Sequence, residues 1–228
     1  MRTAAILPVK RFAQAKQRLG ASVDDPLRLE LARAMVGDVL AALTETASIE
    51  RTIVVTGEPS VADAARARGA IVIDDTAQSG QSAAVTLGIE RALTEGIERA
   101  LCIPGDCPTL DPVELEALLG PSADGALEVV IVPDRHGTGT NGLLLAPPDT
   151  IPPSFGPDSC ERHRALALAA GVVCCIERPA SLLLDIDTGE DLTALRTRLS
   201  TERIRAPRTR AVLDRTAAKG RPAITTPA

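Results

Sequence analysis

The sequence predicts a single α/β domain built on a mostly parallel sheet flanked by helices. Short runs of β-forming residues alternate with longer segments whose apolar residues recur at helical spacing. Most of the short runs are continuously apolar, as expected for strands covered on both faces. The length of 228 residues lies below the ~250–300 at which chains divide into several domains. Repeated β-α-β units with right-handed crossovers then imply a parallel sheet.

The strands are expected where these apolar runs occur. Each run is five or six residues long and is followed by a turn or a polar segment. In chain order the predicted strands are Ala4–Val9, Thr52–Thr56, Ala70–Asp74, Ala100–Pro104, Val129–Pro133 and Gly142–Ala146.

The intervening segments carry the pattern of amphipathic helices. In the first of them, apolar residues recur every four positions from Leu27 to Leu43. Ser60 is a predicted N-cap with Asp63 three residues on, and Pro112 suits a first helical turn. The predicted helices are Leu27–Thr46, Ser60–Arg68, Ser82–Thr94, Pro112–Leu119, Ser159–Ala170 and Gly189–Leu199.

Charge and composition exclude several classes of partner. The net charge is −5, and residues 1–200 hold 18 Lys and Arg against 28 Asp and Glu. Such an acidic body argues against a nucleic acid as the main partner, because phosphate neutralisation dominates that binding. Two Phe, no Tyr and no Trp leave no stacking platform for single strands.

The last 28 residues differ in composition from the rest. Residues 201–228 contain seven Lys and Arg against two acids, with many Thr, Ala and Pro. We therefore expect a domain over 1–200 followed by a basic, disordered C-terminal tail that is dispensable for catalysis. Contact of this tail with the acidic body, an anionic surface or a nucleic acid is the alternative.

Cysteine spacing and hydropathy indicate a cytoplasmic protein. The five cysteines form no Cys-x-x-Cys pair, which argues against a structural zinc site or a disulfide framework. The apolar run near the start is too short for a signal peptide, and Lys10 and Arg11 follow it. No stretch of about 18 apolar residues is present, so no membrane partner is expected.

Candidate chemistry is expected beyond the carboxyl ends of the strands, where open α/β sheets bind ligands. The loop after the first predicted strand holds four cations within nine residues, Lys10, Arg11, Lys16 and Arg18. This density suits a triphosphate, although a solvated basic loop has the same composition. Neither a dinucleotide fingerprint nor a Walker loop accompanies the cations.

Two acidic turns complement that loop. Asp106 follows the fourth predicted strand on a Gly/Pro turn, a position suited to a hard divalent cation. Asp185 and Asp187 follow a second apolar run and should share one side of an extended segment. The alternatives are structural: Asp106 can cap its own turn, and Thr188 can cap the next helix.

Three polar turns complete the candidate site. Gln78–Ser82 precedes a helix, and its amides and the Gln81 and Ser82 side chains can contact a base or sugar edge. Gly137–Gly142 and Phe155–Ser159 offer backbone N–H groups to an anion. Ordinary turn chemistry explains any one of them alone.

Taken together, these motifs resemble the CofC/FbiD guanylyltransferases, in order, from about Ala4 to Leu199. The Ser-Phe-Gly-x-x-Ser turn combined with the Gly-Thr-Asn turn is the most specific part. The matching segments are Pro8-Val9-Lys10, Lys16-x-Arg18-Leu19, Gly80-Gln81-Ser82, Pro104-Gly105-Asp106-Cys107-Pro108, Gly139-Thr140-Asn141-Gly142, Ser154-Phe155-Gly156-Pro157-Asp158-Ser159 and Asp185-Ile186-Asp187-Thr188.

The resemblance implies a nucleotidyltransferase architecture, GT-A-like and Rossmann-like, and a role for each motif. The family joins GMP from GTP to a small phosphorylated three-carbon acid and releases pyrophosphate. The phosphate-binding cations would be Lys10, Lys16 and Arg18. The guanosine turn would be Gly80, Gln81 and Ser82. The ligands of Mg²⁺ or Mn²⁺ would be Asp106, Asp185 and Asp187. The acceptor turns would supply Thr140, Asn141, Gly156 and Ser159, with Thr140 and Asn141 interchangeable in the alignment.

The reaction that the resemblance implies needs no general base, because a phosphate monoester is already ionised near neutral pH. His136 and His163 are therefore expected to be surface or structural residues. An Ala- and Arg-rich composition suggests a high-GC bacterium, which favours phosphoenolpyruvate over 2-phospho-L-lactate as the acceptor. A molybdopterin or sugar nucleotidyltransferase and a non-catalytic nucleotide-binding module are the alternatives. Handover of the product to the next enzyme of the pathway is a possible partnership.

Overall fold

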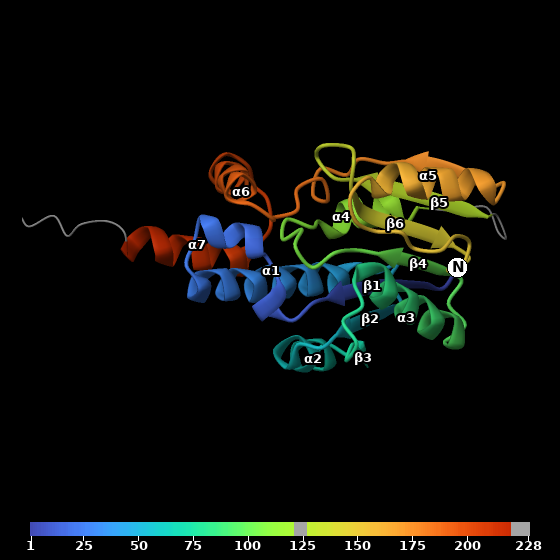
Figure 1. Ribbon diagram of the computed structural model, residues 1–228, viewed down its shortest axis with the longest axis horizontal. Helices are drawn as coiled ribbons and strands as arrows, with labels where there is room; N and C mark the ends of the chain where they lie inside the picture. The colour runs from blue at the N-terminus through green and yellow to red at the C-terminus, as the bar shows by residue number, and fades with distance from the viewer. Residues whose placement is uncertain (121–126, 220–228) are drawn as a thin grey trace, which may run out of the picture.

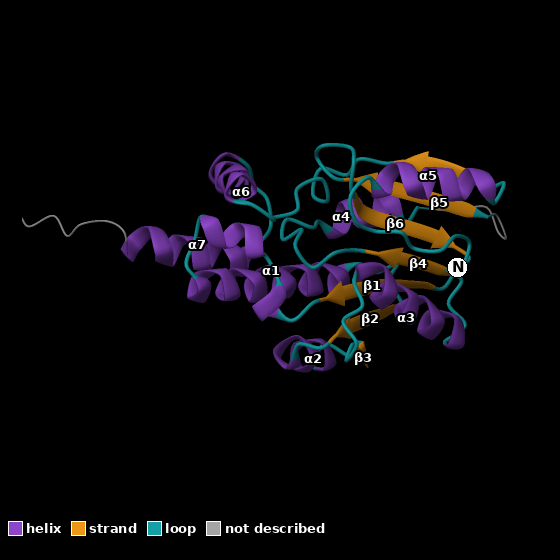
Figure 2. Cartoon of the chain, viewed as in Figure 1, coloured by secondary structure: helices purple, strands orange, loops and turns teal. Residues whose placement is uncertain are grey.

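The computed structural model describes residues 1–120 and 127–219, and a seven-stranded sheet lies at its centre (Figures 1 and 2). The strand order is β3-β2-β1-β4-β6-β5-β7. Only β6 runs antiparallel to its neighbours among these strands, so the predicted mostly parallel sheet is confirmed. The strands are β1 (Thr3–Val9), β2 (Arg51–Thr56), β3 (Ile71–Asp74), β4 (Arg99–Cys102), β5 (Glu128–Pro133), β6 (Thr140–Ala146) and β7 (Val173–Ile176).

Helices cover both faces of the sheet. The alternation of side chains along β1 divides the core, because Ala5 and Leu7 pack under α1, α2 and α4. Ala4 and Ile6 face α3 and α5 on the opposite side. The helices are α1 (Asp25–Glu45), α2 (Pro59–Arg66), α3 (Gln81–Thr94), α4 (Pro112–Leu118), α5 (Ser159–Ala169), α6 (Gly189–Thr201) and α7 (Pro207–Lys219).

Two predicted helix starts have different outcomes. Ser60 is not an N-cap: α2 begins one residue earlier because Pro59 occupies its first turn, and Glu58 takes the cap position. Thr188 does cap α6. Its hydroxyl accepts from Asp191 N–H at 3.3 Å, and Thr188 N–H donates to Asp191 Oδ2 at 2.8 Å. This reciprocal pair is a capping box.

Strand β7 is the strand that sequence patterning missed. It is only four residues long, Val-Cys-Cys-Ile, and shows no alternation of polar and apolar residues. It is held in the extended conformation by parallel pairing with β5 at the sheet edge, because its own sequence has no strand pattern.

The expected disordered tail is wrong for most of its length. Pro207–Lys219 forms α7, which lies alongside α1 (Figure 1). Ala206, Val212 and Leu213 are buried in a cluster with residues of α1 and α6. The sequence signal was weak because only a few apolar residues carry this packing among many cations. The last nine residues of the expected tail, 220–228, lie outside the described part of the chain.

A buried carboxylate on α1 holds the start of α7. Asp38 Oδ1 accepts from Arg208 N–H at 3.0 Å, while Asp38 Oδ2 accepts from Thr209 N–H at 2.9 Å. Asp38 thus satisfies the free amides at the N-terminus of another helix. Gly37 permits the close approach, since a Cβ there would lie 2.8 Å from Arg208 Cδ. The tail therefore docks on the body, which was the alternative expectation.

A helix that crosses a bilayer needs about 20 consecutive, predominantly apolar residues. None of the helices within residues 1–120 and 127–219 is long and apolar enough to cross one.

Candidate active site

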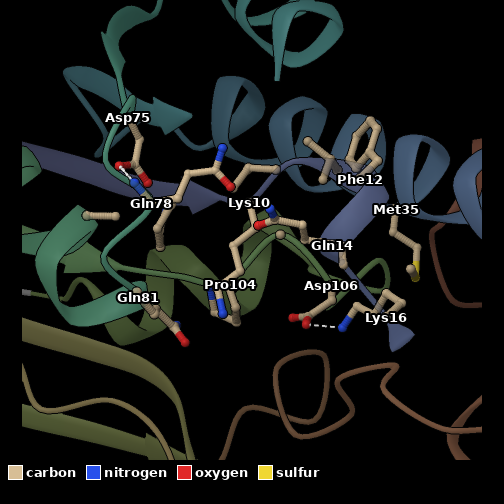
Figure 3. Close-up of a pocket in the computed structure, with 18 of the residues that line it drawn as sticks. Lys10, Phe12, Gln14, Lys16, Met35, Asp75, Gln78, Gln81, Pro104 and Asp106 are labelled. Atoms are coloured by element: carbon tan, nitrogen blue, oxygen red, sulfur yellow. Dashed lines mark hydrogen bonds and ion pairs between the residues drawn. The ribbon is translucent and has the colours of Figure 1, made fainter. Parts of the chain in front are cut away.

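A cavity of about 260 Å³ opens at the carboxyl ends of β1, β3 and β4, the edge predicted to bind a ligand. Lys10 and Lys16 reach it from the loop after β1, and Asp106 from the turn after β4 (Figure 3). Asp187 comes from the segment before α6. The fold therefore gathers cations and acids that lie up to 177 residues apart in sequence.

Lys16 is the central cation. Its ammonium contacts Asp106 Oδ2 and lies 2.6 Å from Asp187 Oδ1, while its side chain is only 9% exposed. Burial lowers the pKa of Lys16, but the two carboxylates outweigh burial and raise the pKa above its ordinary value. Its backbone adopts a left-handed φ of 58°, uncommon outside glycine and frequent at functional sites.

The acids next to Lys16 have the chemistry of a divalent-cation site. Asp106 Oδ1 is buried and accepts no hydrogen bond from the described residues. Carboxylate oxygens are the ligands that Mg²⁺ and Mn²⁺ prefer, so an unused, buried oxygen here fits such an ion. Within the described ranges, no three acidic, His or Cys side chains already form a metal cluster. Instead the Lys16 ammonium lies between Asp106 and Asp187.

The two acids before α6 take different partners. Burial raises the pKa of Asp187, but the Lys16 charge outweighs burial and sets the pKa below its usual value. Burial and the nearby charges of Asp106 and Asp187 raise the pKa of Asp185 to about 6. Asp185 Oδ1 accepts from Asn141 Nδ2 at 3.2 Å, so β6 holds it in place. A divalent cation would offset the repulsion that raises this pKa.

Backbone contacts bring these acids to Asp106. Ile186 N–H donates to the Asp106 carbonyl at 3.1 Å. Asn141 Nδ2 also donates to Leu182 O at 2.8 Å, which fixes the segment that precedes Asp185. Asn141 therefore connects β6 to the acidic segment that contains Asp185.

Arg28 is a contributor that the sequence analysis missed. It is buried in the first turn of α1, and its guanidinium donates to Phe12 O at 3.0 Å and to Ala15 O. These bonds anchor the loop that carries Lys10 and Lys16. The anchoring role of Arg28 cannot be recognised from local sequence, because the two carbonyls that its guanidinium holds belong to a different segment.

The predicted nucleotide turn occupies the start of α3. Gly80 has a φ of 107° and precedes Gln81, and both line the cavity. Ser82 does not line it: its hydroxyl accepts from Phe155 N–H at 2.9 Å. Ser82 thus ties the nucleotide turn to the predicted acceptor turn.

The predicted acceptor turns meet around a buried histidine. Ser154 N–H donates to His163 Nε2 at 2.9 Å, and Thr140 Oγ1 lies 3.0 Å from His163 Nδ1. A neutral ring that accepts at Nε2 carries its proton on Nδ1, so His163 donates to Thr140. The Thr140 hydroxyl hydrogen is then free for a ligand. Gly156 adopts a φ of 115°, and Ser159 opens α5.

His163 should make stability fall in acid. Burial, followed by the charge of Arg162, lowers the pKa of His163 to about 4. The unfolded chain takes up a proton near pH 6.5 while the folded chain does not, so stability is lost between about pH 6.5 and 4. We expect this loss to be about 2 kcal/mol smaller in His163→Gln between pH 7 and 4.5, measured by urea unfolding. The exposed His136→Gln is the control, and equal pH dependence of both variants would contradict the assignment.

The structure thus separates the predicted site residues into two groups. The cavity lining includes Lys10, Lys16, Gly80, Gln81, Asp106 and Asp187. The remaining predicted residues do not line the cavity; they are Arg18, Ser82, Thr140, Asn141, Gly156, Ser159 and Asp185. Arg18 is exposed, while contacts described above connect Asn141, Asp185 and Ser82 to the lining. Asp75 and Gln78 line the cavity. Gln78 begins the turn predicted to contact a base or sugar, whereas Asp75 was not predicted to have a role there.

Solved structures share this fold. A putative nucleotide-diphospho-sugar transferase from Desulfovibrio desulfuricans superposes with a TM-score of 0.71 at 18% identity, covering 96% of each chain. A nucleotidyl transferase from Methanothermobacter thermautotroptrophicus gives 0.60 at 20% identity, covering 88% of this chain and 99% of the other. At such identities the likeness concerns the architecture, and the expected nucleotidyltransferase fold is confirmed.

Sequence relatives are much closer. The chain is 48% identical to the phosphoenolpyruvate guanylyltransferase of Conexibacter woesei over 214 residues, 94% of this chain and 96% of that one. It is 40% identical to the enzyme of the same name from Rubrobacter xylanophilus, over 84% and 92% of the two chains. The model of the family described as "Guanylyl transferase CofC like" matches residues 3–202. The chain therefore belongs to the CofC-like guanylyl transferase family.

Proposed function

We propose that the protein transfers GMP from GTP to phosphoenolpyruvate and releases pyrophosphate. The product is enolpyruvoyl-2-diphospho-5'-guanosine, a precursor of the deazaflavin redox cofactor. The observation that carries this proposal is the 48% identity to a phosphoenolpyruvate guanylyltransferase along nearly the whole of both chains.

The proposed reaction brings two anions together. An oxygen of the acceptor phosphate attacks the α-phosphorus of GTP, and the bond from that phosphorus to the β-phosphate oxygen breaks. Neutralising charge and aligning the two substrates are the main tasks of the protein. No residue has to remove a proton from the acceptor, which agrees with the structural role of His163.

Cations of the first loop suit the triphosphate. Lys10 and Lys16 line the cavity, and Arg18 follows on the short helix Gln17–Ala21. Because Lys16 is held between two carboxylates, its charge is already desolvated and oriented before the nucleotide binds. We assign Lys10, Lys16 and Arg18 to the phosphates and the departing pyrophosphate.

Asp106, Asp185 and Asp187 are the residues that would hold Mg²⁺ or Mn²⁺. When bound, the metal would supply positive charge to the phosphate oxygens that react. The Lys16 ammonium has to move away from one of the two carboxylates for an ion to bind both. Release of Lys16 would direct its charge toward the phosphates.

The acceptor is assigned to the turns around His163. Thr140 offers a hydroxyl donor there, and the Gly156 and Ser159 backbone lies at the start of α5, where an anion is favoured. Asn141 supports this side through Asp185.

An acceptor screen tests the proposed function. The purified protein is incubated with GTP, Mg²⁺ and either phosphoenolpyruvate or 2-phospho-L-lactate, and pyrophosphate and product mass are measured. We expect phosphoenolpyruvate to be the better substrate. Turnover only with 2-phospho-L-lactate, with a pterin or with a sugar phosphate would reassign the acceptor. GTP binding without pyrophosphate release would indicate a non-catalytic module.

Ser159→Ala should separate the two substrate sites. A hydrogen bond to a charged acceptor contributes about 1.5–3 kcal/mol, so we expect the KM for the acceptor to rise roughly 10- to 100-fold. The KM for GTP should change little, because the nucleotide is assigned to the cavity. Steady-state kinetics at saturating co-substrate measure both values, with the exposed Ser200→Ala as control. A rise in the KM for GTP alone would mean that the two sites are assigned the wrong way round.

A further inference from the structure

Two polar side chains at one end of the cavity have no part in the phosphate, metal and acceptor assignments above. Asp75 and Gln78 follow β3 and lie on the opposite side of the cavity from the Asp106–Lys16 pair (Figure 3). A nucleotide whose phosphates lie at Lys16 has its base at the other end. The environment of Asp75 and Gln78 is therefore the environment of the base.

Asp75 is a rigidly held carboxylate with an unused oxygen. The residue is 7% exposed, and its backbone N–H donates to Thr56 O at 3.1 Å. Asp75 Oδ1 accepts from Gln78 N–H at 2.9 Å. No donor within the described ranges reaches Asp75 Oδ2. Gly57, directly after β2, packs closely against the Asp75 backbone, since a Cβ there would lie 2.8 Å from Asp75 O.

Gln78 adds a second unused acceptor. Its Oε1 is buried and receives no hydrogen bond from the described residues. Its backbone has a left-handed φ of 46°, a costly conformation that the bond to Asp75 maintains. A buried polar atom without a partner is expensive unless a ligand satisfies it.

Unused acceptors select a base that presents donors. The Watson–Crick edge of guanine carries N1–H and a 2-amino group side by side, which offer three hydrogens. The corresponding edge of adenine has an unprotonated N1, which a carboxylate repels. A carboxylate oxygen can accept a second hydrogen bond, so Asp75 Oδ1 stays available despite Gln78 N–H.

We propose that Asp75 and Gln78 read the guanine edge. The Asp75 carboxylate accepts N1–H and one amino hydrogen, and Gln78 Oε1 accepts the other amino hydrogen. This inference rests on the proposed function for the identity of the nucleotide, and it names the residues that make the site select guanine.

Nucleotide binding without an acceptor tests the inference. Calorimetry with Mg²⁺ compares GTP, XTP, ITP and ATP on the native protein and on Asp75→Asn. Asn keeps the oxygen that accepts from Gln78 N–H but places a donor opposite the amino group. We expect GTP affinity to fall about 100-fold and XTP affinity to rise about 10-fold, because the xanthine C2 carbonyl accepts from the new amide. Asp74→Asn is the matched control, since Asp74 is exposed and does not line the cavity.

Gln78→Met provides a second, independent measurement. It keeps the length of the side chain and removes the acceptor for the second amino hydrogen. GTP affinity should fall about 10-fold while ITP, which lacks the amino group, is unaffected. If Asp75→Asn does not fold, this variant decides the inference.

The outcomes distinguish the inference from the proposed function. If the native protein binds no GTP, the proposed function fails and the inference with it. If the native protein prefers GTP but Asp75→Asn keeps the native XTP-to-GTP ratio, the function stands and the assignment of Asp75 is wrong. An unchanged GTP-to-ITP preference in Gln78→Met overturns the role of Gln78.

Discussion

Asp106→Asn is expected to lower kcat by about 1,000-fold or more while the fold stays intact. Asp106 lines the cavity and contacts Lys16, and its Oδ1 is buried without a hydrogen-bond donor among the described residues. The substitution removes one negative charge from the site and replaces an anionic oxygen by an amide. We therefore expect the substitution to lower the affinity for a divalent metal and to leave the Lys16 side chain less firmly oriented. The measurement is kcat at saturating GTP, phosphoenolpyruvate and Mg²⁺, with a thermal melt to verify folding.

The exposed Asp63→Asn on α2 is the control for Asp106→Asn. It makes the same change of charge in a residue that pairs with Arg66 on the helix surface, so its kcat should equal the native value. Near-native turnover of Asp106→Asn at saturating Mg²⁺ would refute the assignment of Asp106.

Deletion of α7 is expected to destabilise the protein strongly. A chain that ends at Arg205 loses the burial of Ala206, Val212 and Leu213 against α1 and α6. It also leaves the buried Asp38 carboxylate without its donors from Arg208 and Thr209. Burying one Val and one Leu contributes about 3–5 kcal/mol, so the Tm should fall by about 10 °C or more. Thermal melts of the deleted and full-length chains measure the difference.

A chain that ends at Lys219 is the matched control. It lacks only residues 220–228 and keeps α7, so its melting temperature should be native. Equal melting temperatures of all three chains would show that α7 does not stabilise the body. Lower activity of the Arg205 chain is also expected, because Leu19, Met35 and Ile186 share the cluster that α7 completes.

The elements that could be predicted are those with an extended run of apolar residues or several turns of helical apolar spacing. Apolar runs located β1, β2 and β5, and helical spacing located α1 and α3. Pattern fails where an element depends on contacts with distant residues. Strand β7 is ordered by β5, and α7 is capped by a carboxylate on α1.

The site divides in the same way. Lys10, Lys16, Asp106 and Asp187 were predictable because charged residues at strand ends stand out against apolar strands. Arg28, Asp75 and the side chain of Gln78 were not predicted to contribute to the site. Each of them acts through a carbonyl, an amide or a cavity that other segments supply, and these partners are not visible in the local sequence.

By itself, the sequence determined the class of fold, the family motifs and the edge of the sheet at which the cavity lies. These depend on periodicity and on residue types, which are local properties of the chain. Only the tertiary structure decided that Lys16 lies between Asp106 and Asp187, that His163 donates to Thr140, and that the basic C-terminal segment is a docked helix. Each of these depends on distances between segments far apart in sequence, and burial makes the energy of a charge or a polar atom sensitive to those distances.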